Sequence, residues 1–152
     1  MLKINVVCVG NIKDKFFEDA QNEYKKRLQK YCTLNILELK ELNYLDQQSL
    51  IIEKESEEIL QNIKGHFVLL DVLGKQMTSE KFADFLNELQ NISSEITFVI
   101  GGSYGVSEKL KKLAKNRISF SQMTFPHRLF RVMLLEQIYR AFCINSGSPY
   151  HK

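Results

Sequence analysis

Two short stretches near the end of the chain hold most of the side chains that could do chemistry. They are Met123-Thr124-Phe125-Pro126-His127-Arg128 and Ser148-Pro149-Tyr150-His151-Lys152. Pro126 suits the first position of a helix, and a helix start attracts anions because its first amides are unpaired and its dipole is positive there. His127 and His151 are therefore candidates for accepting or relaying a proton beside a negatively charged ligand.

A third basic side chain strengthens the case for an anion or RNA site. Arg131 follows His127 by four residues, which places both on one face of the predicted helix. Its guanidinium is expected to stabilise a developing anion or to hold a phosphate. Glu136, on the same helix, is expected to pair with a basic neighbour rather than to act as an acid. Two plainer interpretations stay open: His127 as an ordinary first-turn residue, and Tyr150-His151-Lys152 as a frayed chain end.

Glycines upstream mark a second place where a ligand can approach. Gly101 and Gly102 directly follow an apolar run, and without Cβ atoms their backbone can pass close to a ligand. A turn that requires positive φ explains the pair equally well. The glycine spacing does not match the dinucleotide-binding fingerprint, and Gly74-Lys75 lacks the Ser or Thr of a P-loop. No Gly-x-Ser-x-Gly elbow or metal-ligand spacing is present, so no NAD, ATP hydrolysis, serine hydrolysis or metal is implied.

Size and composition are those of one ordinary globular domain, residues 1–152. Hydrophobic residues make up 44% of the chain and charged residues 26%. No run approaches the roughly 18 apolar residues of a membrane span, and no signal peptide precedes the first strand-like run. Cys8, Cys32 and Cys143 are scattered, as free thiols in a reducing compartment would be. We therefore expect a cytoplasmic protein without a membrane partner.

The net charge of +3 is too small to prove a nucleic-acid partner. Positive residues do cluster in two predicted helices, at Lys25, Lys26, Arg27 and Lys30 and at Lys109, Lys111, Lys112, Lys115 and Arg117. Charge alone favours solvated helix faces over an RNA-binding surface.

Hydrophobic periodicity predicts five strands that alternate with five helices. The strands are expected at 3–10, 34–39, 67–72, 96–100 and 118–121, and the helices at 14–31, 46–63, 79–89, 107–115 and 126–144. Thr78 or Ser79 is expected to cap the third helix, Gly74 to end the third strand and Gly147 to end the last helix.

This alternation is typical of an α/β domain with three layers and a mainly parallel sheet. Ligands of such sheets bind beyond the carboxyl ends of the strands. The loops that follow Val72, Ile100 and Ser121 are therefore the predicted location of the site.

Four groups of residues, taken together, indicate a family. They are Ile100-Gly101-Gly102-Ser103-x-Gly105, then Phe120-Ser121-x-Met123-Thr124-Phe125-Pro126-His127, then Arg131-Val132-x-Leu134-x-Glu136-Gln137-Ile138-Tyr139-Arg140-Ala141-Phe142, and finally Pro149-Tyr150-His151-Lys152. In this order they resemble the SPOUT-class methyltransferases that modify a pseudouridine of bacterial large-subunit ribosomal RNA. The resemblance extends over the whole chain and is most specific in the C-terminal third.

The resemblance implies a C-terminal deep trefoil knot and a homodimer, neither of which the periodicity shows. It also implies S-adenosylmethionine as methyl donor, bound by loops of the knot. Carried onto this sequence, the donor site comprises residues that follow three strands: Leu70, Gly101, Phe120, Ser121, Gln122, Met123, Thr124 and Phe125. The expected catalytic residues are His127, Arg131, Tyr150 and His151, with the Tyr150-His151 tail completing the site across the dimer interface.

The implied activity is methylation of ring nitrogen 3 of a pseudouridine in 23S ribosomal RNA of the assembled 70S ribosome, with no DNA partner. That imide nitrogen must lose a proton, so a base or a positive charge is needed beside it. Two alternatives remain open: a SPOUT enzyme that acts on transfer RNA, and a knotted module that binds the ribosome without chemistry. A flavodoxin-like nucleotide binder is a weaker interpretation, because no phosphate loop follows Gly10.

Overall fold

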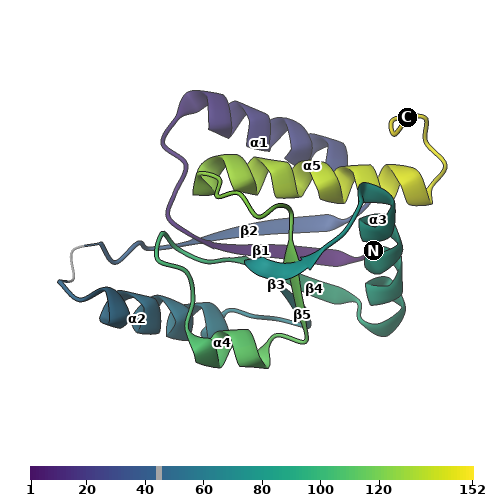
Figure 1. Ribbon diagram of the computed structural model, residues 1–152. Helices are drawn as coiled ribbons and strands as arrows, with labels where there is room; N and C mark the ends of the chain where they lie inside the picture. Colours follow the sequence, from purple (N-terminus) through teal and green to yellow (C-terminus); the bar gives the residue numbers. More distant parts are fainter. Residues whose placement is uncertain (44–45) are drawn as a thin grey trace.

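The computed structural model describes residues 1–43 and 46–152, and a sheet of five strands forms its centre (Figure 1). The strands are β1 (Lys3–Val9), β2 (Thr33–Leu39), β3 (His66–Gln76), β4 (Glu95–Ile100) and β5 (Asn116–Ser119). Every neighbouring pair is parallel, in the order β2-β1-β4-β3-β5. The predicted α/β class and mainly parallel sheet are therefore confirmed, and all carboxyl ends lie at the same end of the sheet.

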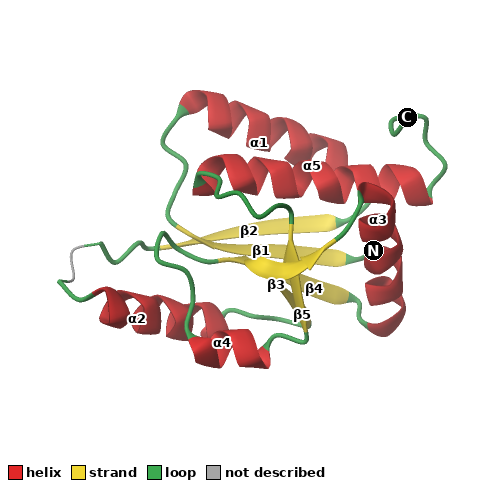
Figure 2. Cartoon of the chain, viewed as in Figure 1, coloured by secondary structure: helices red, strands yellow, loops and turns green. Residues whose placement is uncertain are grey.

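Helices cover both faces of the sheet, which gives the predicted three layers. They are α1 (Lys15–Leu28), α2 (Gln48–Gln61), α3 (Ser79–Ile92), α4 (Glu108–Leu113) and α5 (His127–Asn145). Figure 2 shows α1, α3 and α5 on one face and α2 and α4 on the other. Parallel strands require such crossover helices, and the helices shield both faces from water. Across the described residues, no helix combines the length and the apolar character needed to cross a membrane.

The core consists of two hydrophobic clusters, one on each face of the sheet. On β1, Ile4 and Val6 belong to the cluster under α1, α3 and α5, whereas Val7 and Val9 belong to the cluster over α2 and α4. This alternation follows from the two-residue period of a strand. Leu134 of α5 is completely buried in the first cluster, so α5 is part of the core over much of its length.

Strand β3 differs from the prediction, because it does not end at Gly74. It continues to Gln76, and its pairing with β5 shifts register between Leu70 and Lys75. A Cβ atom on Gly74 would lie 2.7 Å from the carbonyl oxygen of Arg117. Only glycine therefore lets the bulged strand return this close to β5, and the glycine marks a close approach rather than a strand end.

Both ends of α5 agree with the prediction. Pro126 occupies the position immediately before the first helical residue. At the other end Gly147 has a φ of +73°, and the N–H groups of Gly147 and Ser148 donate to the carbonyls of Ile144 and Cys143. This Schellman arrangement satisfies the last carbonyls of the helix and redirects the chain after it.

Substitution of Gly74 tests the close approach of β3 and β5. Gly74→Ala should lower the free energy of unfolding by about 1–3 kcal/mol, because the added methyl group meets the Arg117 backbone and cannot be accommodated by a rotamer change. Urea unfolding followed by circular dichroism measures the loss. Equal stability of the variant and the parent protein would contradict this packing.

Candidate active site

A cavity of about 330 Å³ opens at the carboxyl ends of β3, β4 and β5, and we call it the strand-end cavity. It is lined by Leu70, Asp71, Val72, Ile100, Gly101, Gly102, Ser103, Gly105, Val106, Lys111, Ile118, Ser119, Phe120, Ser121, Met123, Thr124, Phe125, His127 and Phe130. This is the end of the sheet that the parallel-strand rule selected. The volume falls in the range of pockets that bind small molecules.

The wall after β4 is built from glycines for two different reasons. Gly105 has a φ of +86°, and its N–H donates to the carbonyl of Gly102 at 3.0 Å, which closes a tight turn. A Cβ atom on Gly101 would lie 2.6 Å from Cγ1 of Val106, and one on Gly102 would lie 2.4 Å from Oε1 of Glu55. Neither Gly101 nor Gly102 has a positive φ, so a turn that requires positive φ does not explain the pair. Both lie against side chains of the protein itself, and their approach to a ligand stays a prediction.

The wall after β5 is a short polar turn beside aromatic rings. The hydroxyl of Ser119 donates to the carbonyl of Ser121 at 2.9 Å, and the Ser121 hydroxyl accepts from the Met123 N–H at 3.1 Å. Phe120 packs against Phe130 of α5 with ring centroids 5.0 Å apart. An aromatic surface next to polar backbone groups suits a flat heteroaromatic ligand with polar edges.

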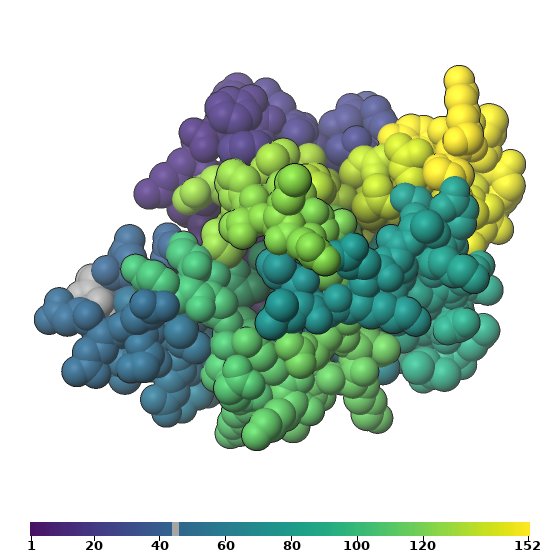
Figure 3. Space-filling view, in the orientation of Figure 1, coloured from purple at the N-terminus to yellow at the C-terminus, as the bar shows by residue number. Residues whose placement is uncertain are grey.

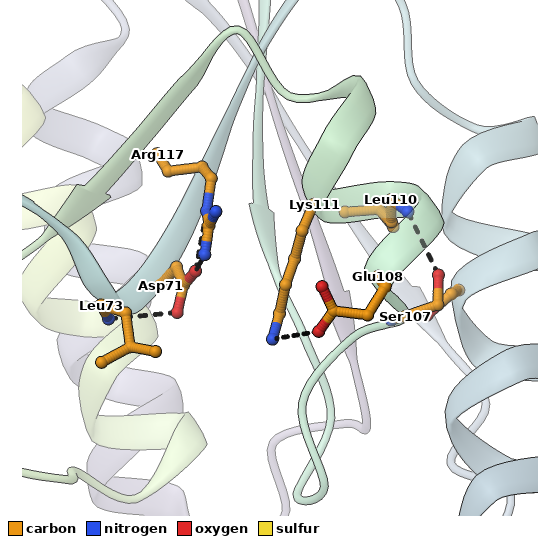
Figure 4. A network of polar contacts seen from close by, with 8 residues as sticks. Asp71, Leu73, Ser107, Glu108, Leu110, Lys111 and Arg117 are labelled. Carbon is orange, nitrogen blue, oxygen red and sulfur yellow. Dashed lines mark hydrogen bonds and ion pairs between the residues drawn. The ribbon is translucent and has the colours of Figure 1, made fainter.

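A charged pair links β3 to β5 beside the cavity, as Figure 4 shows: Asp71, which lines the cavity, and Arg117, which does not. Nε of Arg117 donates to Oδ2 of Asp71 at 2.9 Å, and the Leu73 N–H donates to Oδ1 at 3.2 Å. Burial opposes ionisation of Asp71, but these hydrogen bonds outweigh it and hold the pKa of the carboxyl below its usual value. Asp71 therefore stays ionised at neutral pH, and it secures the bulge of β3 rather than acting as a base.

His127, the first residue of α5, lines the cavity and is half-buried. Burial disfavours the charged imidazole and lowers its pKa, and the charges of Arg128 and Arg131 act in the same direction. Glu41 and a hydrogen bond with the Gly101 backbone oppose this shift without reversing it. The imidazole is therefore mainly uncharged at neutral pH, which is the form that can accept a proton.

Most of the residues expected to bind the donor lie together. Those that line the strand-end cavity are Leu70, Gly101, Phe120, Ser121, Met123, Thr124 and Phe125. Gln122 is exposed and does not line it. Sequence reasoning missed Asp71 and Lys111. Asp71 interrupts an apolar run, which is a signal that could have found it, whereas no local pattern distinguishes Lys111 from the other lysines of α4.

Arg131 is not placed to contact a substrate, which corrects the expectation of an anion or phosphate contact. Its side chain is only 2% exposed. The guanidinium donates to Oε2 of Glu38 at 2.5 Å, to the Gly10 carbonyl at 3.0 Å and to Oε1 of Gln21 at 3.3 Å. Arg131 therefore ties α5 to β1, β2 and α1, and it positions His127 one turn earlier in the same helix.

The residues after α5 pack back against α5 and α3 and are not frayed (Figure 3). The Tyr150 hydroxyl donates to Oε1 of Glu136 at 3.1 Å, and the Arg140 guanidinium lies 4.8 Å from the Tyr150 ring centroid. Arg140 also contacts Nδ1 of His151 at 3.0 Å, and Nε2 of His151 lies 2.7 Å from Oε1 of Glu80. Because a guanidinium only donates, Nδ1 accepts and Nε2 carries the proton. We call these five residues the tail network.

The tail network lies apart from the strand-end cavity. Glu136 pairs with Arg140 at 2.6 Å, as predicted, and burial together with the Glu136 charge raises the pKa of Tyr150 to about 12. Neither Tyr150 nor His151 lines the cavity. Glu136 lies about 14 Å further along the α5 axis than His127, at a rise of about 1.5 Å per residue. Within one chain, the expected catalytic residues therefore lie in two separate regions, the strand-end cavity side of α5 and the tail network.

The titration of His127 tests this description of the cavity. We expect its midpoint in an NMR titration to lie below the ordinary value of about 6.5, because burial disfavours the charged ring. Glu41→Gln should lower the midpoint further, since it removes a charge that supports the imidazolium. The exposed control Glu57→Gln should leave it unchanged. A midpoint at or above the ordinary value would contradict the burial of His127.

Similarity to known proteins extends over almost the whole chain. The family model described as "Predicted SPOUT methyltransferase" matches residues 2–151. Ribosomal RNA large subunit methyltransferase H of Clostridium acetobutylicum is 50% identical over 99% of this chain and 100% of that protein. The protein of the same name from Fusobacterium nucleatum is 45% identical, with the same coverage.

Solved structures show the same fold. A probable methylase family protein from Haemophilus influenzae Rd KW20 superimposes with a TM-score of 0.55 at 9% identity, over 98% of this chain and 70% of that one. Methyltransferases of the SPOUT class take the methyl group from S-adenosylmethionine. Because the family model covers nearly every residue, the chain belongs to the SPOUT methyltransferases.

Proposed function

We propose that this protein transfers the methyl group of S-adenosylmethionine to ring nitrogen 3 of a pseudouridine in 23S ribosomal RNA. Membership of the SPOUT family supports methyl transfer, and relatives at 45% and 50% identity carry the name ribosomal RNA large subunit methyltransferase H. The observation that carries the proposal is the strand-end cavity. It gathers nearly all of the expected donor-binding residues around His127. The pKa of His127 is lowered, so its imidazole is uncharged at neutral pH and can accept a proton.

The strand-end cavity suits S-adenosylmethionine in size and in chemistry. A volume of about 330 Å³ is adequate for a ligand of this size. Phe120 and Phe130 offer aromatic surface for an adenine ring, and Gly101 and Gly102 line the cavity without side chains of their own. Asp71 lines the cavity as a carboxylate whose charge is offset by its partner Arg117. When bound, the donor supplies a methyl group activated by its positively charged sulfur.

His127 accepts the proton of nitrogen 3 in this proposal. An imide nitrogen ionises well above neutral pH, so a positioned base lowers the barrier to its attack on the methyl group. The lowered pKa keeps His127 in its neutral form, and the hydrogen bond with the Gly101 backbone orients the ring. Arg131 contributes by holding α5, and thus His127, against the sheet.

The tail network acts in a homodimer in this proposal, with the Tyr150-His151 tail of one protomer completing the strand-end cavity of the other. Two observations support it: the tail is ordered by Glu136 and Arg140, and it does not line the cavity of its own chain. The Tyr150 hydroxyl keeps its proton, since its pKa is about 12, and in this proposal it exchanges its hydrogen bond to Glu136 for one to a carbonyl of the base. The deep trefoil knot belongs to the same proposal and is supported by family membership.

Recognition of the RNA is proposed to depend on the assembled 70S ribosome. Residues 1–152 then act as one catalytic domain in the cytoplasm, without DNA or a membrane as partner. The net charge is only +3, so contacts with phosphates must come from local clusters. Exposed lysines that could supply them are Lys25, Lys26 and Lys30 of the α1 region and Lys109 and Lys112 of α4.

Methyl transfer to a panel of RNAs tests the proposal. The protein is incubated with methyl-labelled S-adenosylmethionine and with assembled ribosomes lacking the modification, separated subunits or transfer RNA. We expect label in the large-subunit RNA of assembled ribosomes. Label in transfer RNA would overturn the substrate assignment. Donor binding without label in any RNA would favour a silent ribosome-binding module over an enzyme.

A variant of the tail tests its proposed part in the reaction. His151→Ala should lower turnover on ribosomes by about 10²-fold or more, the range expected for a residue that moves or orients a proton. Its affinity for S-adenosylmethionine should change little, because the residues expected to hold the donor come from the loops after β3, β4 and β5 and not from the tail. Lys152→Ala, at the exposed neighbouring position, is the control. Equal losses of turnover and donor affinity would contradict this role.

A further inference from the structure

A buried carboxyl lies directly behind the glycine wall of the strand-end cavity. Glu55 of α2 is 3% exposed, and its Oε2 accepts a hydrogen bond from the Leu42 N–H at 3.0 Å. Its Oε1 has no hydrogen-bond partner within the described part of the chain. That oxygen is the atom that a Cβ on Gly102 would meet at 2.4 Å, with Cγ1 of Val9 at 3.3 Å from the same point. The unpartnered oxygen thus faces the backbone of Gly102.

The next residue of α2 holds the other end of the same wall. Ser56 is 1% exposed, and its hydroxyl accepts from the Ser107 N–H at 2.8 Å. Ser107 in turn caps α4, since its hydroxyl accepts from the Leu110 N–H at 3.2 Å. Two consecutive buried polar side chains of α2 therefore contact the two ends of the segment 102–107.

Glu55 also supports the segment that acts on His127. The Leu42 N–H binds Glu55, and the preceding Glu41 accepts a hydrogen bond from the Ser103 hydroxyl at 3.2 Å. The charge of Glu41 favours the protonated form of His127. A displacement of Glu55 would therefore change the cavity in two ways: it would move the glycine wall, and it would shift Glu41 relative to His127.

The surroundings of Glu55 disfavour a charge on its carboxyl. Burial raises its pKa, the Leu42 N–H opposes the shift, and the charges of Glu41 and Glu58 reinforce it. Both charged groups that act on Glu55 are acidic. An ionised Glu55 would hold a negative oxygen against Gly102 without a hydrogen-bond partner in the described part of the chain, which is costly in a buried position.

We propose that Glu55 is a positioning residue for the donor-binding wall, and that the wall keeps its binding-competent position only while the Glu55 carboxyl is neutral. The inference rests on the proposed function of the strand-end cavity. The free-energy cost of ionising Glu55 falls if the wall moves away or if water enters behind Gly102. Either change disturbs the surface that the donor contacts. Because coupling is reciprocal, donor binding then favours the protonated carboxyl, and the protonated carboxyl favours donor binding.

Donor affinity as a function of pH tests this coupling. Calorimetric titration with S-adenosylmethionine between pH 5 and 9 compares the parent protein with Glu55→Gln, which keeps the shape without the charge. We expect the parent to lose affinity relative to Glu55→Gln as pH rises, by about tenfold for each unit by which the donor shifts the Glu55 pKa. His127 titrates in both proteins, so its contribution cancels in the ratio. Glu57→Gln removes an exposed charge from the same helix and should follow the parent.

A measurement without the donor separates this inference from the proposed function. Hydrogen exchange of the amides of 102–107 should be faster in the parent than in Glu55→Gln at high pH and equal at low pH. The melting temperatures of the two proteins should also diverge as pH rises. The Glu55 carboxyl ionises above about pH 4.3 in the unfolded chain but keeps its proton to higher pH in the folded one. Only the parent therefore loses stability as pH rises above that value. Identical pH dependence in both proteins would overturn the inference. The expected exchange without donor binding would instead overturn the proposed function.

Discussion

The buried guanidinium of Arg131 is the interaction on which the position of the site depends. It connects α5 to Glu38 of β2, to the Gly10 carbonyl after β1 and to Gln21 of α1. A buried cation persists only where it is paired and hydrogen-bonded, so these contacts fix the first half of α5 against the sheet. The imidazole of His127, one turn earlier, is therefore placed over the strand ends by the interior of the protein and not by a loop.

The parallel sheet supplies the rest of the site. Because β4 pairs with both β1 and β3, its carboxyl end opens at the centre of the sheet, where the glycine wall begins. Polar groups of α2 support that wall from behind, and Asp71 of β3 lines the cavity and pairs with Arg117 of β5. The result is a cavity whose lining includes a neutral histidine, the form that can accept a proton. The tail network lies outside the cavity of its own chain, and the proposed site therefore combines residues of two protomers.

Much of the fold could be predicted because it depends on local patterns. Thr78, for example, caps α3 by accepting a hydrogen bond from the Lys81 N–H at 3.1 Å, as the sequence indicated. The strand-end rule likewise found the cavity. Predictions failed where contacts between distant segments determine the structure. The prediction that Gly74 ends β3 was wrong, because no neighbouring residue in the sequence indicates its close approach to β5. Arg131 follows His127 by four residues, but its guanidinium is turned toward β1 and β2 while His127 lines the cavity, which only the folded chain shows. Glu55 carries no local signal in the sequence, and only the fold shows that it is buried behind Gly102.

The identity of the methylated nucleoside tests the central claim most directly. Ribosomes that lack the modification are incubated with the protein and labelled S-adenosylmethionine, the large-subunit RNA is digested to nucleosides, and the labelled product is identified by mass spectrometry. The account predicts one labelled nucleoside, pseudouridine methylated at nitrogen 3, formed by the parent protein and strongly reduced with His127→Asn. Label on a different nucleoside, or an undiminished rate for His127→Asn, would contradict it.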